Sequence, residues 1–98
     1  MPRDLWSGLQ YQDITTSIAY LLRLKSTDGV IITDVERNSP WDEAGLEMED
    51  VIMEINGNRL HSSEELDNLR ERMKLKSGDE LELTVYRNRR IYSARIKF

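Results

Sequence analysis

The sequence contains no cysteine, and this absence removes several kinds of chemistry at once. Without thiols the chain can form no disulfide, no thiolate nucleophile and no cysteine-ligated zinc site. The sequence also has a single histidine, His61, no phosphate-binding loop, and no acidic run with the alternating ligands and central glycine of a calcium loop. We therefore expect a domain that needs no metal and no cofactor.

Long apolar runs are also missing. No stretch approaches the ~20 residues that a membrane-spanning helix needs, and the first residues lack the apolar core of a signal peptide. The net charge of −4 argues against nucleic-acid binding, because phosphate contacts need a surplus of Lys and Arg. The length of 98 residues suits one domain, expected to span residues 1–98.

Apolar runs with β-branched or alternating character predict the strands. The strongest run extends from Gly29 to Val35, and a second one from Asp50 to Ile55. A third run, from Glu80 to Val85, alternates apolar and polar residues, which is typical of a strand with one buried face. A short turn at Asn88-Arg89 is expected to join it to a last strand from Ile91 to Phe98.

The helix signals are equally local. Ser62 and Glu65 have the spacing of a capping box and predict a helix over residues 62–74. Residues 39–45 predict a one-turn helix with serine before proline and a final glycine, and residues 16–24 predict another short helix. Together these elements predict an α+β fold, a partly open antiparallel barrel or sandwich of about five strands capped by two or three short helices.

A series of short motifs follows a fixed order along the chain. Trp6-Ser-Gly-Leu9 leads directly into a predicted strand at Gln10, Tyr11 and Gln12. Downstream come Gly29-Val-Ile-Ile, Asn38-Ser-Pro40, Glu43-Ala-Gly-Leu46, Asp50-Val-Ile52 and Glu54-Ile-Asn-Gly57. This succession resembles the PDZ domains of the HtrA/Deg serine proteases over residues 5–98. With the loop first and an extra strand last, it is similar to the circularly permuted order of the bacterial members.

The resemblance implies a domain that binds peptides by strand addition and performs no catalysis of its own. In such domains an extended chain end lies between the strand after the loop and the capped helix. The amides of Ser7, Gly8 and Leu9 are then expected to hold the terminal carboxylate, and Gly8 to allow close approach and unusual dihedral angles. The expected peptide-binding residues are Trp6, Ser7, Gly8, Leu9, Gln10, Tyr11, Gln12, Leu66, Leu69, Arg70 and Met73.

Specificity is expected from side chains near the groove. Leu9 with Leu66, Leu69 and Met73 could form an apolar pocket for the last residue of the ligand, and Arg70 is a candidate for reading a polar or acidic group. The family usually has a bulky aliphatic residue where this chain has Ser7, so one apolar anchor is lost there.

The resemblance also implies partners and a setting. The partners would be C-terminal or unfolded segments of substrate proteins and an adjacent protease domain on the N-terminal side, with the isolated domain monomeric. The setting would be the bacterial cell envelope or periplasm. The alternative is a PDZ domain of another protease (site-2, C-terminal processing or Lon-like) or of a secretion-system scaffold.

Several residues have more than one interpretation. His61 beside Ser62, with Asp67 nearby, suggests a catalytic triad, but Ser62 is better explained as a helix cap and triads are normally assembled from distant segments. Trp41 could be a partly buried plug or an exposed contact. The carboxylates between Asp42 and Asp50 predict a solvated acidic surface. The last hairpin is locally basic. These cations could serve solubility, or they could dock an acidic partner or a neighbouring domain: Arg87, Arg89, Arg90, Arg95 and Lys97.

Overall fold

The computed structural model describes residues 5–98, so the first four residues of the expected domain lie outside it. Five strands form where the sequence predicted them: β1 Leu9–Asp13, β2 Val30–Val35, β3 Val51–Ile55, β5 Glu80–Arg87 and β6 Arg90–Lys97. A sixth strand, β4 Asn58–Arg59, has two residues and was not predicted.

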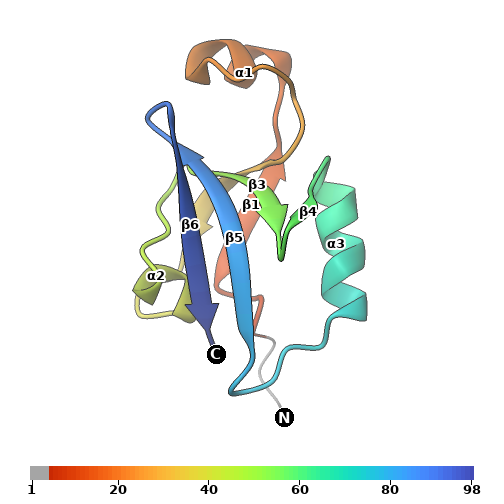
Figure 1. Ribbon diagram of the computed structural model, residues 1–98, viewed down its shortest axis with the longest axis vertical. Coiled ribbons are helices and arrows are strands. Elements are labelled where there is room, and N and C mark those ends of the chain that lie inside the picture. Colours follow the sequence, from red (N-terminus) through yellow and green to blue (C-terminus); the bar gives the residue numbers. More distant parts are fainter. Residues whose placement is uncertain (1–4) are drawn as a thin grey trace.

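The strands form one antiparallel sheet that does not close into a barrel. Along residues 5–98 the order is β1-β2-β3-β5-β6, with β4 paired to β3, which makes six strands in all. β1 and β6 are therefore the two edges of the sheet. The β6 edge carries Arg90, Arg95 and Lys97, whereas the β1 edge is turned toward a helix (Figure 1).

The helices α2 and α3 begin at the caps that the sequence indicated. In α2, Pro40–Glu43, the Asp42 amide donates to the hydroxyl of Ser39 at 3.2 Å. In α3, Ser63–Arg72, the Glu65 amide donates to the hydroxyl of Ser62 at 3.2 Å. The Glu65 carboxylate accepts from the amide of His61, one residue before the cap. The first helix, α1, covers Thr16–Leu22 and projects at one end of the long axis, opposite the C-terminus (Figure 1).

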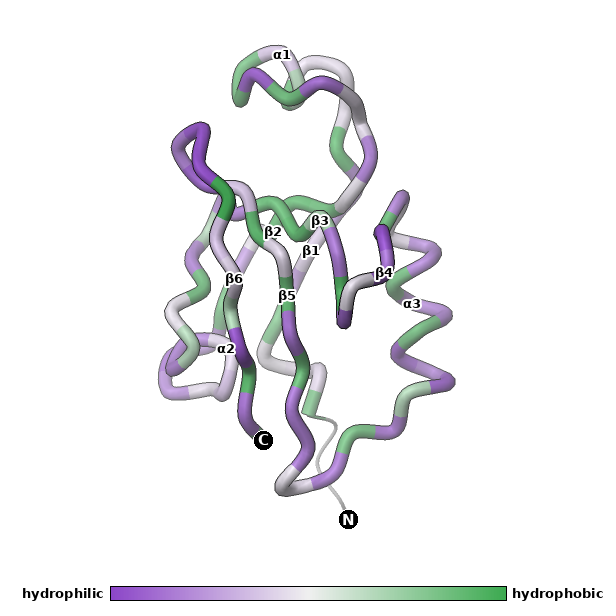
Figure 2. Tube along the Cα trace, in the orientation of Figure 1, coloured by the Kyte–Doolittle hydropathy of each residue, from purple (hydrophilic) through white to green (hydrophobic). Residues whose placement is uncertain are grey.

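The core lies where apolar segments of β2, β3 and β5 meet, while the β5–β6 turn is hydrophilic (Figure 2). Trp41 is fully buried in this core, which decides between the two interpretations of that residue. Its indole nitrogen donates to the carbonyl of Leu5 at 3.0 Å. Its ring lies 5.1 Å from that of Trp6 and 5.2 Å from that of Phe98. Trp41 is thus a plug that holds the first and last described segments together.

Asp50 departs from the expectation of a solvated acidic surface. Its side chain is buried and is held by Arg87 through two hydrogen bonds of 2.7 and 2.6 Å. The same guanidinium donates to the carbonyl of Gly45 at 2.8 Å and pairs with Glu47 at 3.0 Å. The hydrogen bond to Asp50 raises the pKa of Arg87 above its usual range. Arg87 is therefore a structural clamp rather than part of a freely solvated basic hairpin.

Candidate functional site

The turn before β1 brings backbone donors to the start of an edge strand. The carbonyl of Gly8 accepts from the amide of Glu36 at 2.8 Å, which anchors the turn to the segment after β2. The amide of Leu9 donates to the carbonyl of Trp6 at 3.1 Å, so that donor is used inside the turn. Among residues 5–98 no acceptor pairs with the backbone amides of Ser7 and Gly8.

Gly8 is required for close packing rather than for its backbone angles. A β-carbon at this position would lie 3.0 Å from Cβ of Ser39 and 3.2 Å from Cδ1 of Trp41. Its φ is not in the left-handed region that favours glycine. The expected unusual dihedral angle is therefore wrong, and close approach of a ligand to Gly8 stays a prediction, because the contacts seen here are with the core.

The outer edge of β1 faces α3. Within residues 5–98, β2 is the only strand that pairs with β1, so the outer backbone edge is not hydrogen-bonded to another strand. Contacts with α3 use side chains of β1, such as the Asp13 carboxylate that accepts from the backbone amide of Ser63 at 2.7 Å. This arrangement leaves a strand edge beside a helix, with side chains between them.

Tyr11 forms the main bridge from β1 to α3. Its hydroxyl donates to Asp67 at 2.5 Å and accepts from the guanidinium of Arg70 at 3.3 Å. The Arg70 guanidinium carbon also lies 5.8 Å from the ring centre of Trp6 and 5.9 Å from that of Tyr11. Burial, the largest cause, raises the pKa of Tyr11. We call Tyr11, Asp67 and Arg70 the polar bridge.

The seven predicted site residues other than Ser7, Gly8, Tyr11 and Arg70 divide into three groups. Trp6, Leu9 and Leu66 are buried in the core beneath the bridge. Leu69 and Met73 are half-buried and pack against that core from α3. Gln10 and Gln12 are exposed on the other face of β1.

Sequence reasoning missed two members of this region, Asp13 and Asp67. The spacing of three between Asp67 and Arg70 places both on one helix face and is the signal that could have found Asp67. Nothing in the sequence indicated that Asp13 would contact the amide of Ser63.

His61 does not take part in a triad. It is exposed, and its Nδ1 lies 3.1 Å from the Glu65 carboxylate, while Ser62 caps α3. The backbone hydrogen bond from His61, followed by the one from its ring, lowers the pKa of Glu65. Over residues 5–98 no group of three or more His, Cys, Asp or Glu side chains could hold a metal ion. In the same residues no helix is long and apolar enough to cross a membrane.

Comparison with known families agrees with this geometry. A model of the PDZ domain family matches residues 8–98, so the chain belongs to the PDZ domain family. Probable periplasmic serine endoproteases of the DegP-like type are similar to it. The one from Hahella chejuensis is 34% identical over 82% of this chain and 19% of its own length. The one from Rhizobium meliloti is 30% identical over 85% of this chain and 16% of its own length.

Solved structures share the fold. The HtrA3 PDZ domain bound to a phage-derived ligand has a TM-score of 0.73 at 26% identity, covering 92% of this chain and 80% of its own. The HtrA-type protease AlgW with a decapeptide has a TM-score of 0.75 at 23% identity, covering 94% of this chain and 28% of its own. The chain is thus a peptide-binding module related to the HtrA proteases, and it spans less than a fifth of the length of the curated relatives described above.

Proposed function

We propose that the domain captures extended, apolar C-terminal segments by strand addition to β1, opposite α3, for substrate recognition or regulation of an HtrA/Deg-like serine protease. The observation that carries the proposal is the edge position of β1, whose outer side faces α3 and, among residues 5–98, pairs with no other strand. Such an edge offers donors and acceptors to any extended segment regardless of its sequence.

The turn before β1 supports recognition of a chain end. Ser7 and Gly8 have amides without an acceptor among residues 5–98, and a carboxylate can accept from both. Because Leu9 donates within the turn, the proposed grip uses two amides instead of the three expected from the sequence.

The apolar residues of α3 that face β1 support a preference for a peptide whose last residue is apolar. Leu69 and Met73 are the half-buried members that an incoming side chain can reach, while Leu66 is fully buried beneath them. Burying one Leu- or Val-sized side chain there would contribute roughly 1.5–3 kcal/mol.

The polar bridge stands between the strand edge and the helix, so a ligand has to rearrange it. Insertion of a strand would separate Tyr11 from Asp67 and break the hydrogen bond from Arg70 to Tyr11, and the Arg70 guanidinium would then lie beside the ligand, where it can pair with a polar or acidic group. Removing the bridge with Tyr11→Phe is expected to ease entry and to tighten binding of purely apolar peptides.

The proposal is tested by titrating the domain with matched peptides that end in valine. A free carboxylate is expected to bind at least about tenfold more tightly than the amidated end, because two charge-assisted hydrogen bonds are lost. N-methylation of an amide that pairs with β1 is expected to weaken binding, while N-methylation of the neighbouring amide, which faces away, is the control. Equal affinity of the free and amidated peptides contradicts carboxylate recognition.

A substitution of Gly8 is not a suitable test of the site. Because a β-carbon there would press on Ser39 and Trp41, Gly8→Val is expected to unfold the core and not merely to block the ligand. Leu69→Ser and Met73→Ser are better variants, since both side chains are half-buried, and each is expected to weaken binding of a valine-ended peptide.

The protease context rests on the relatives. Their names describe periplasmic serine endoproteases, which supports a periplasmic setting and an adjacent protease domain. That the isolated domain is monomeric stays a prediction. The region of the gene that precedes this domain tests this proposal: a trypsin-like Gly-Asn-Ser-Gly-Gly motif is expected, and flanking apolar spans would point to a membrane protease instead.

A further inference from the structure

The helix α1 exposes apolar side chains that folding does not explain. Its inner face packs on a second core cluster through Ala19, Ile18 and Leu22. Its outer face presents Tyr20 and Leu21, which are 83% and 75% exposed. Large apolar side chains that remain this exposed mark a surface for interaction when others gather around them.

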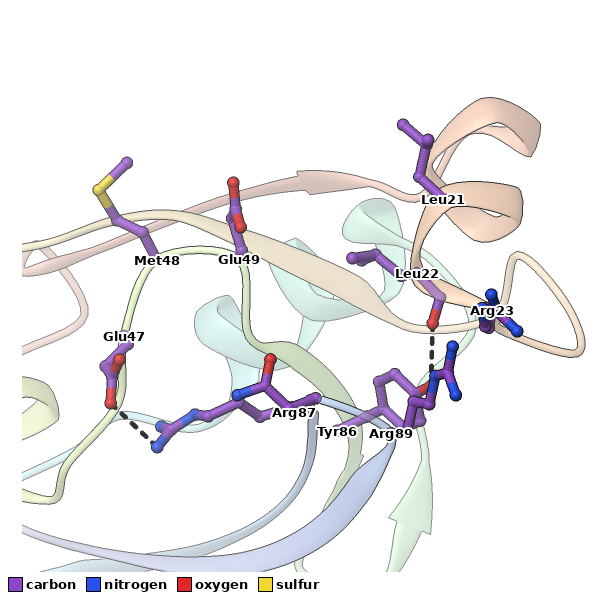
Figure 3. Close-up of a pocket in the computed structure, with 10 residues that line it drawn as sticks. Leu21, Leu22, Arg23, Glu47, Met48, Glu49, Tyr86, Arg87 and Arg89 are labelled. Atoms are coloured by element: carbon purple, nitrogen blue, oxygen red, sulfur yellow. Dashed lines mark hydrogen bonds and ion pairs between the residues drawn. The ribbon is translucent and has the colours of Figure 1, made fainter.

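Other exposed apolar residues lie at the same end of the molecule. Met48, 62% exposed, and Leu21 line one hollow of about 350 Å³ whose wall includes Leu22 and Tyr86 (Figure 3). The hydroxyl of Tyr86 donates to the carbonyl of Leu22 at 2.9 Å, which fixes α1 to β5 and gives the hollow a defined shape. Ile91, 65% exposed, lines a neighbouring apolar hollow that also contains Tyr86.

Two cations stand at the rim of the first hollow. Arg23 and Arg89 both line it, and neither has an ion pair with another residue in the range 5–98. Arg87 is different, because Asp50 and Glu47 already hold it. Both rim arginines have positive φ, 59° and 63°, where glycine would be less strained. The chain thus keeps two guanidinium groups beside the hollow at conformationally unfavourable positions.

We propose that this end of the domain, defined by Tyr20, Leu21, Arg23, Met48, Arg89 and Ile91 and here called the α1 surface, docks a protein segment that carries aromatic or aliphatic side chains next to carboxylates. The apolar side chains enter the hollows, and the carboxylates pair with the two arginines. This site is separate from the β1 edge and needs no terminal carboxylate, so it does not depend on the proposed peptide capture.

A protein partner fits these features better than a membrane surface does. The hollow is concave and of mixed sign, because Glu47 and Glu49 line it across from the arginines (Figure 3). An acidic, apolar segment can satisfy the arginines and the apolar wall while avoiding the two glutamates.

The test uses synthetic peptides that alternate Leu and Phe with Asp and Glu, acetylated and amidated at their ends so that they carry no terminal charge. Titration of the ¹⁵N-labelled domain is expected to shift amide signals of residues 20–25, 48–49 and 86–91, and not those of β1. A peptide with Lys in place of Asp and Glu is expected not to bind.

The matched variants change the same charge at two ends of the molecule. The double variant Arg23→Gly and Arg89→Gly relieves the backbone strain at both positive φ positions. It is expected to weaken binding of the acidic peptide roughly threefold to tenfold. Lys74→Ala with Lys76→Ala, both exposed and between α3 and β5 at the opposite end, is expected to leave the affinity unchanged (Figure 1).

Three outcomes overturn the proposal: absence of acidic-peptide binding, shifts confined to β1 and α3, or equal loss of affinity in the two double variants. Sedimentation with vesicles of equal parts phosphatidylglycerol and phosphatidylcholine tests whether a lipid surface is the partner instead of a protein. Binding to these vesicles without binding to the acidic peptide would identify a lipid surface as the partner and would overturn a protein partner. Failure of peptide capture at β1 would leave all of these results unaffected.

Discussion

At the scale of single residues, the pair of Asp50 and Arg87 shows how one buried carboxylate is made compatible with a core. Burial of the Asp50 carboxylate is costly unless it is both paired and hydrogen-bonded. Arg87 supplies two short hydrogen bonds, and the amide of Glu47 donates a third to the same carboxylate at 2.9 Å. The pair links the segment before β3 to the end of β5.

Asp50→Asn is expected to lower the free energy of unfolding by about 3 kcal/mol, because the guanidinium of Arg87 loses its buried counter-charge. Denaturation in urea measures the change. The control is Glu47→Gln, which removes a carboxylate from the same arginine but at a largely exposed position, and which is expected to cost about 0.5 kcal/mol or less. Similar losses in both variants would contradict the role of burial.

Glu65 and His61 give a prediction on pH. The pKa of Glu65 is lowered in the folded state, so its contribution to stability is present above the usual titration range of glutamate and is lost as the pH falls through the folded pKa. The first cause is the His61 amide rather than the His61 ring. In an NMR titration of the Glu65 carboxyl carbon, His61→Ala should therefore keep most of the lowering. A return to the ordinary value would show that the ring dominates.

At the scale of elements, the β5–β6 hairpin has a turn of the kind that asparagine and glycine favour. Asn88 and Arg89 have φ values of 51° and 63° between the paired residues Arg87 and Arg90. This is the geometry of a two-residue type I′ turn, in which the second position prefers glycine. Arg89 is therefore at a position where its side chain weakens the turn.

Arg89→Gly is expected to raise the free energy of unfolding by about 1 kcal/mol, because the left-handed conformation then carries no β-carbon penalty. Thermal and chemical denaturation measure the gain. The neighbouring change Arg90→Gly, in extended backbone, is expected to destabilise instead. A loss of stability in Arg89→Gly would mean that the arginine side chain makes a stabilising contact in solution.

The cap of α3 can be tested on two adjacent serines. Ser62→Ala removes the hydroxyl that accepts from the Glu65 amide and is expected to cost about 1 kcal/mol. Ser63→Ala follows one position later, where the backbone amide and not the hydroxyl makes the contact with Asp13, and is expected to change stability by no more than about 0.5 kcal/mol. Equal effects in chemical denaturation would contradict the assignment of Ser62 as the cap.

The elements could be predicted because their signals are local. Ser39 and Ser62 cap helices within a few residues of themselves, and the alternation from Glu80 to Val85 lies within one strand. The pairing of Asp50 with Arg87 could not be predicted, since the two residues are 37 positions apart and meet only through the register of β3 with β5. The burial of Trp41 depends in the same way on Trp6 and Phe98, which come from the opposite ends of the chain.

The candidate site shows the same division. The loop and the strand that follows it were found through the order of motifs, and that order also indicated α3 as the facing helix. The bridge between Tyr11 and Asp67 required the relative rotation of β1 and α3, which a sequence pattern does not define. The use of the Leu9 amide inside the turn depends on the local geometry of residues 6–9, which the order of motifs does not define.

At the scale of the whole molecule, stability should be distributed unevenly. β3 and β5 lie inside the sheet and contribute to the main core, whereas α1 is held mainly by Ala19, Ile18 and Leu22 on the smaller cluster. Hydrogen exchange is expected to show the slowest amides in β3 and β5, and exchange by local opening in α1. Protection of α1 equal to that of β3 would contradict this order.

The two edges of the sheet, β1 and β6, differ in how easily another strand could pair with them. β1 is sheltered by a helix, but β6 presents eight residues of extended backbone with Arg90, Arg95 and Lys97 along it. If two molecules met along β6, cations of one would align with cations of the other, and their repulsion would oppose fibril-like growth from that side. If β1 binds peptides as proposed, the charges on β6 would allow the domain to keep one open strand edge for ligands without polymerising through the other edge. Replacing Arg90, Arg95 and Lys97 by neutral residues should therefore increase aggregation of the domain, which light scattering measures.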